Sequence, residues 1–103
     1  MDSETTISIS VPTYDSSTGV VHFRTPDEQL AVRVSPSGEV WIEGCPAGLR
    51  ALARDLLTLA QEGVPSGSEV FLMSKGSAAS LAEGSVSLRL VRTAEPTQES
   101  LMN

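Results

Sequence analysis

The stretch PAGLRALARDLLTLAQE, residues 46–62, decides the fold of this chain of 103 residues. At 100° per residue its apolar side chains share one arc of about 160°; they are Leu49, Leu52, Ala53, Leu56, Leu57, Leu59 and Ala60. The other side carries polar residues, namely Arg50, Arg54, Asp55, Thr58, Gln61 and Glu62. This periodicity predicts one amphipathic helix that buries its leucine face against the rest of the chain.

Signals at both ends support these helix bounds. Pro46 suits the first helical position, where its missing N–H costs nothing. Gly63 can adopt the left-handed conformation that ends many helices, and Pro65 follows shortly after. We expect five leucines on this face to form the centre of the core. Replacing Leu56 with alanine would then cost about 2–5 kcal/mol.

Alternating apolar and polar residues predict strands on both sides of the helix. Before it, residues 5–11, 20–24, 30–34 and 40–43 fit this pattern, and Ser35-Pro36-Ser37-Gly38 predicts a hairpin turn. After it, residues 69–73 form a nearly continuous apolar run, and residues 86–91 alternate again. The side chains expected to point inward are Leu30, Val32, Val34, Val40, Ile42, Val86, Leu88 and Leu90.

These elements predict an α+β fold built as a two-layer sandwich. One main helix would pack on one face of a mixed, mostly antiparallel sheet of about five to six strands. The strand at 40–43, the helix and the strand at 69–73 would form a right-handed β-α-β crossover. We expect a single domain over 1–103, with its core at about 5–92 and a flexible tail at 93–103.

Composition limits the classes of partner. Thirteen acidic residues against seven basic ones give a net charge of −6, which argues against nucleic-acid binding. The acidic surface suits solubility, and it would equally suit a basic protein partner. No signal peptide, lipidation motif or membrane-spanning stretch is visible and there is one cysteine, so we expect a cytoplasmic protein without membrane association.

The residue inventory offers little for catalysis. One cysteine and one histidine cannot supply a structural zinc site. A nucleophilic pair would require Cys45 and His22 to meet in space, whereas the simpler interpretation makes Cys45 the N-cap of the helix and leaves His22 solvated. Lys75-Gly76-Ser77 lacks the earlier glycine of a phosphate loop. Carboxylates such as Glu39, Glu43 and Glu69 fit a solvated sheet face, so we expect no enzyme, no cofactor and no metal.

One face of the predicted sheet carries aromatic side chains. By alternation Trp41 and Phe71, with Met73, point away from the helix, on the side of Glu43 and Arg89. Tryptophan beside charged residues is typical of protein–protein hot spots. Alternatively the register is shifted by one residue, or the N-terminal segment or the 74–84 loop covers these rings. Under the first interpretation Trp41, Glu43 and Phe71 are the candidate partner-binding residues.

The central part of the chain resembles a known family. The run Val40-Trp41-Ile42-Glu43-Gly44, then Pro46, Leu49, Leu52-Ala53 and Leu56-Leu57-x-Leu59-Ala60, with the later Gly84-Ser85, Leu88 and Leu90, is similar to the immunity protein 32 family. The similarity spans roughly residues 40–92. This chain differs from the family pattern at Cys45, where an acidic residue is frequent, and at Glu69 and Phe71, where histidine is frequent.

The resemblance implies a small α+β protein from a bacterial polymorphic-toxin locus. Such a protein binds a cognate protein toxin and neutralises it without chemistry of its own. No functional residue of the family carries over to this chain, because the matching positions are core and turn residues. If the chain acts in this way, the outward-facing Trp41, Glu43 and Phe71 are the contacts that strand alternation predicts. A second interpretation is a non-catalytic scaffold subunit that forms a homodimer or docks on a larger enzyme. A third is a small enzyme, which would require a reactive, low-pKa Cys45.

Overall fold

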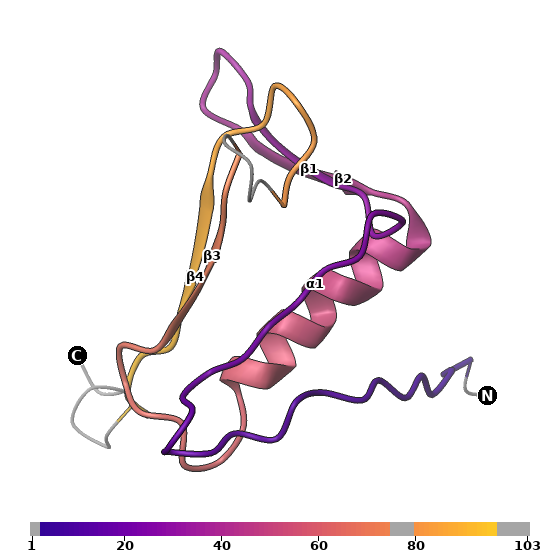
Figure 1. Cartoon of the computed structure of the whole chain (residues 1–103). Helices are drawn as coiled ribbons and strands as arrows, with labels where there is room; N and C mark the ends of the chain where they lie inside the picture. Colours follow the sequence, from indigo (N-terminus) through magenta and orange to yellow (C-terminus); the bar gives the residue numbers. More distant parts are fainter. Residues whose placement is uncertain (1–2, 75–79, 97–103) are drawn as a thin grey trace.

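The computed structural model describes residues 3–74 and 80–96, and it has an α+β fold (Figure 1). In chain order the elements are β1 (Leu30–Val34), β2 (Val40–Gly44), α1 (Pro46–Leu59), β3 (Glu69–Leu72) and β4 (Leu88–Val91). The predicted α+β class is therefore confirmed. The predicted strands at 30–34, 40–43 and 69–73 are found with small changes at their ends, and the last strand begins two residues later than expected.

The strands form two separate antiparallel hairpins. β1 pairs with β2, and Val32 lies opposite Ile42. The turn between them confirms the Ser35–Gly38 prediction, because Gly38 adopts a φ of 89° and donates its N–H to the Ser35 carbonyl at 2.9 Å. β3 pairs with β4, and Val70 lies opposite Leu90.

A single sheet of five to six strands in a two-layer sandwich is not confirmed. Four strands are found in the described part of the chain, in two sheets. The predicted crossover was wrong, because β2 pairs with β1 whereas β3 pairs with β4. The second edge of β1 is already occupied: the N–H groups of Ala82 and Val86 donate to the carbonyls of Leu30 and Val32 at 2.8 and 2.9 Å. β3 therefore has no edge of β1 to join.

Two predicted strands near the N-terminus are absent. Residues 5–11 and 20–24 form no strand, and neither segment pairs with a strand of the two sheets. Residues 12–14 instead bond to Gln61, two residues after the end of α1: Gln61 Nε2 donates to the Pro12 carbonyl at 2.8 Å, and Gln61 Oε1 accepts from the Tyr14 N–H at 3.0 Å.

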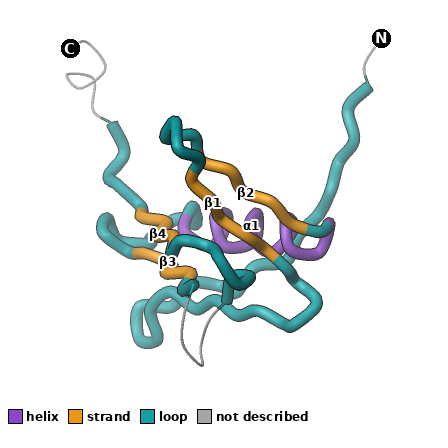
Figure 2. Tube along the Cα trace, turned by 90° about the horizontal axis from the view of Figure 1, so that it is seen from above, coloured by secondary structure: helices purple, strands orange, loops and turns teal. Residues whose placement is uncertain are grey.

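The core lies between the two hairpins and the helix, which surround it on three sides in Figure 1; Figure 2 shows β1 and β2 passing over α1. Its buried apolar residues are Leu30, Val32, Leu59, Val70, Leu72 and Leu81, with Val20, Leu52, Leu88 and Leu90 packed against them. Leu30 and Val32 thus point inward as predicted. The same prediction was wrong for four valine and isoleucine side chains, which are 43–60% exposed: Val34, Val40, Ile42 and Val86.

The helix begins at Pro46 as predicted and ends at Leu59, three residues earlier than expected. Its buried residues are Gly48, Ala51, Asp55, Thr58 and Leu59. Most of the predicted leucine face is therefore exposed, with Leu49, Leu56 and Leu57 exposed by 45–49%. In Figure 1 the chain preceding β1 runs along the helix. Arg24 and Gln29 of that segment lie against Asp55 and Gly48, so the segment covers a different side of the helix from the leucines.

Some predictions concern residues that the structure does not describe. Lys75-Gly76-Ser77 and the part of the predicted tail at 97–103 lie outside the described residues. Residues 93–96 are described and belong to no helix or strand. Among the described residues, no helix has the length and apolar character that crossing a membrane requires.

Candidate functional site

Trp41 and Glu43 lie on the outer face of the β1–β2 hairpin. Half of the Trp41 surface is exposed, and its Nε1–H donates to Glu39 Oε1 at 3.0 Å. Glu43 forms an ion pair with Arg33, whose Nε lies 3.0 Å from Glu43 Oε1, and Arg33 is the cross-strand neighbour of Trp41. This face presents one indole ring bordered by two carboxylates and one guanidinium.

Phe71 lies on the outer face of the other hairpin. Its ring is covered by its cross-strand neighbour Arg89, whose guanidinium carbon lies 4.2 Å from the ring centroid. Arg89 also forms an ion pair with Glu69. The expected side-by-side placement of Phe71 and Arg89 is therefore confirmed. Trp41, however, belongs to a different sheet, so the structure does not gather the three candidate residues on one sheet face.

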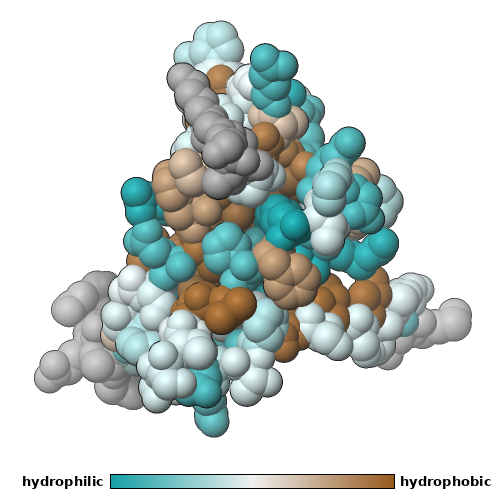
Figure 3. Space-filling model, in the orientation of Figure 1, coloured by the Kyte–Doolittle hydropathy of each residue, from teal (hydrophilic) through white to brown (hydrophobic). Residues whose placement is uncertain are grey.

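A hollow of about 880 Å³ adjoins Phe71. Met73, Leu81 and the segment from His22 to Pro26 contribute to its walls. On the face of the molecule drawn in Figure 3, apolar and hydrophilic side chains are interspersed. Polar side chains such as Arg24 and Thr25 line the hollow together with apolar ones, so Phe71 borders a depression of mixed character.

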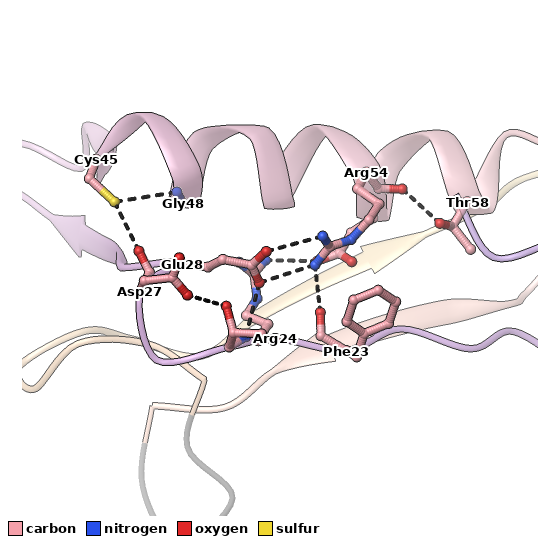
Figure 4. A network of polar contacts seen from close by, with 10 residues as sticks. Phe23, Arg24, Asp27, Glu28, Cys45, Gly48, Arg54 and Thr58 are labelled. Atoms are coloured by element: carbon pink, nitrogen blue, oxygen red, sulfur yellow. Dashed lines mark hydrogen bonds and ion pairs between the residues drawn. The ribbon is translucent and has the colours of Figure 1, made fainter. Parts of the chain in front are cut away.

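Arg54 fastens the helix to the segment before β1 (Figure 4). Its guanidinium forms a forked pair with Glu28, with both N–O distances at 3.1 Å, and donates to the Phe23 carbonyl at 2.7 Å. It also lies 4.3 Å from the Phe23 ring centroid. The hydrogen bond from Arg54 holds the pKa of Glu28 below its usual value.

A second ion pair is more deeply buried. Arg24 Nη2 lies 2.7 Å from Asp55 Oδ2, and the two side chains are 8% and 1% exposed. Asp55 Oδ1 and two of the Arg24 nitrogens have no hydrogen-bond partner. Burial raises the pKa of Asp55, because Asp55 Oδ1 is removed from water and gains no hydrogen bond in return. The charges of Arg24 and His22 act in the opposite direction, toward a lower pKa. This pair positions the 20–29 segment against α1.

Cys45 is the N-cap of α1, as the simpler interpretation predicted. Its sulfur accepts the Gly48 N–H at 3.4 Å and donates to the Asp27 carbonyl at 3.4 Å (Figure 4). The hydrogen bond from Gly48 lowers the pKa of the thiol. His22 is not among the hydrogen-bond partners of Cys45 and instead lies near Asp55. The structure therefore does not bring the hypothetical Cys45–His22 pair together.

The apolar face of the helix was predicted from the sequence, but the prediction was wrong to place most of it in the core. We call it the leucine surface, and it consists of Leu49, Ala53, Leu56, Leu57 and Ala60. Its three leucines are about half exposed, and at the C-terminal end of α1 it borders a groove of about 470 Å³ between the helix and β4. One sequence signal was available: Gly48, Ala51 and Asp55 define a second stripe at helical spacing whose small residues permit close packing.

Comparison with known proteins identifies a family for this segment. The family model of immunity protein 32 matches residues 39–93, which is just over half of the chain and runs from the start of β2 to the residues after β4. The match thus includes Trp41, Phe71 and the whole leucine surface. Searches of curated proteins and of solved structures each find no match.

Proposed function

The chain belongs to the immunity protein 32 family, and on this basis we propose that it binds and neutralises a cognate bacterial toxin. The toxin would be encoded beside it in a polymorphic-toxin locus. Neutralisation would be stoichiometric, because the immunity protein acts by occupying a toxin surface and not by turnover. The bacterial cytoplasm is the compartment in which we place this activity.

The leucine surface is the observation that carries this proposal. Three leucines on the only helix of the described chain are half exposed, and all of them lie inside the family match. Covering them would remove apolar area from water, and each leucine could contribute about 1–2 kcal/mol to association. A partner that covers this surface gives a reason for apolar residues that the fold itself leaves uncovered.

Charge supports a basic toxin as that partner. The net charge of −6 would accelerate encounter with a positively charged surface and would make the association rate fall with added salt. The candidate contacts Trp41, Glu43 and Phe71 remain part of this proposal. Because Trp41 and Phe71 belong to different sheets, we expect a toxin to contact one hairpin face more than the other.

Co-purification with the product of the neighbouring gene tests this function. We expect a one-to-one complex whose affinity is weakened at least about tenfold by the double change Leu49→Ser and Leu56→Ser, since that change removes apolar contact area. Ile7→Ser is the matched control, because Ile7 is 69% exposed and lies outside the family match. If the leucine variant and the control bind equally well, the leucine surface is not the contact.

A scaffold role is the second candidate, and the same surface favours it. Two copies of the chain could cover each other's leucines as a homodimer, or the surface could dock on a larger enzyme. Light scattering of the purified chain separates the first case from toxin binding. A dimer mass that Leu56→Ser converts to a monomer mass would support self-association, whereas a monomer at all concentrations would contradict it.

A further inference from the structure

The chain contains the same three-part arrangement twice: an aromatic ring, an arginine over it and a glutamate beside that arginine. Arg54 lies over Phe23 at 4.3 Å and pairs with Glu28. Arg89 lies over Phe71 at 4.2 Å and pairs with Glu69. In each case the cation gains both the negative face of the ring and a carboxylate.

Trp41 has the ring and the carboxylates of this arrangement without the cation. Glu39 accepts its Nε1–H, and Glu43 lies two residues further along the same face of β2. Arg33, the cross-strand neighbour of Trp41, forms an ion pair with Glu43, with 3.0 Å between Arg33 Nε and Glu43 Oε1. Within residues 3–74 and 80–96 the arginines over aromatic rings are those at Phe23 and Phe71, so no described cation lies over the indole.

The surroundings of Trp41 favour binding of a positively charged group. Indole binds cations better than the other aromatic rings do. The two glutamates against one arginine leave an excess negative charge, and the Arg33, Trp41 and Glu43 side chains are each about half exposed. A planar guanidinium fits best, because it can stack on the ring while its N–H groups reach a carboxylate.

We infer that Trp41, with Glu39 and Glu43, is a receptor for an arginine side chain presented by the toxin. This inference rests on the proposed toxin binding and specifies its chemistry. The arginine would stack on the indole face and donate to Glu39 or Glu43. The complex would thereby complete a third copy of the arrangement that the chain already forms at Phe23 and Phe71.

Substitutions at Trp41 separate ring chemistry from apolar contact. Titration calorimetry is performed with the toxin encoded by the neighbouring gene, in an inactivated form. We expect Trp41→Leu to weaken binding at least about tenfold and Trp41→Phe to retain affinity within about threefold, because phenylalanine keeps the ring face. Since Trp41 is exposed, each variant should unfold at the urea concentration of the unmodified chain.

Charge and partner substitutions complete the test. Glu39→Gln should weaken binding and reduce its dependence on salt, whereas Glu83→Gln, a change outside both hairpins, should do neither. One arginine-to-alanine variant of the toxin should bind the unmodified chain more weakly than the unmodified toxin does. The same variant should bind Trp41→Leu as well as the unmodified toxin does, because the contact is already lost. If Trp41→Leu binds normally, or if no toxin arginine is coupled to Trp41, the receptor is refuted while toxin binding stands.

A probe independent of the toxin keeps the two proposals distinguishable. Trp41 is the single tryptophan, so 5-fluorotryptophan labelling gives one fluorine NMR signal at the site. We expect a tetra-arginine peptide to shift that signal. The shift should be smaller in Glu39→Gln and should be undiminished in Glu83→Gln. A shift without any toxin binding would refute the proposed function, and Trp41 would then be a site for an arginine that the toxin does not supply. No shift would contradict the receptor.

Discussion

At the scale of single residues, Gly48 shows how closely the backbone before β1 approaches the helix. A Cβ at this position would lie 1.8 Å from the Gln29 carbonyl oxygen. The sequence alone gives no sign of this, because a glycine in the first helical turn looks like an ordinary weak point. Its partner lies nineteen positions earlier, in a segment whose path local patterns do not determine. Burial of Asp55 escaped prediction for the same reason, because its partner Arg24 lies 31 positions earlier in the chain.

We predict that Gly48→Ala destabilises the protein by at least about 1–3 kcal/mol, because the added methyl group forces backbone atoms apart. This is opposite in sign to the usual gain of about 0.5–1 kcal/mol for such a change within a helix. Urea unfolding measures it, and Ala53→Gly on the leucine surface provides the ordinary helix effect for comparison. A more stable Gly48→Ala variant would contradict the close approach.

Glu28 gives a pH prediction. Its pKa is lowered from 4.5, so the stabilisation by its pairing with Arg54 is fully present above pH 4.5 and is lost as the pH falls through the lower folded value. We expect Glu28→Gln to reduce stability by about 1–2 kcal/mol near neutral pH and to have little effect in strong acid. Thermal unfolding at several pH values tests this, with Glu83→Gln as control. A loss of the same size at every pH would refute the assignment.

At the scale of elements, the helix was largely predictable from its own sequence, but the side that it buries was not. Pro46, the leucine spacing and Cys45 determine where it begins and that it is amphipathic. Which stripe faces inward depends on the segment before β1, which lies against Gly48 and Asp55. The hairpin turn at Ser35–Gly38 was predictable because its geometry is local, whereas residues 5–11 lack the partner strand that their alternation requires.

Two leucines on the helix should therefore differ sharply in their effect on stability. Leu59 is 5% exposed, so Leu59→Ala should cost about 2–5 kcal/mol. Leu56 is 49% exposed, so Leu56→Ala should cost no more than about 1 kcal/mol. This revises the expectation drawn from helical periodicity. Chemical denaturation of both variants measures their free energies of unfolding. Equal losses of stability would mean that the leucine surface is buried.

At the scale of the whole molecule, the sequence indicates the fold class and the family, but the observed strand topology differs from the predicted one. Alternation predicts which strands exist, but the choice between one sheet and two hairpins depends on residues 82–86 bonding to the edge of β1. The candidate site was predictable in pieces: Trp41 and Phe71 both lie on outer faces, and Arg89 accompanies Phe71. Their separation on two sheets and the exposure of the leucine surface follow from the topology.

The most direct test of the account is a titration of toxin activity. The neighbouring gene's toxin is held at a concentration well above the expected dissociation constant, and increasing amounts of the chain are added. We predict that activity falls linearly and is abolished at about one equivalent, as tight stoichiometric binding requires. Full toxin activity in the presence of a large excess of the folded chain would contradict the account.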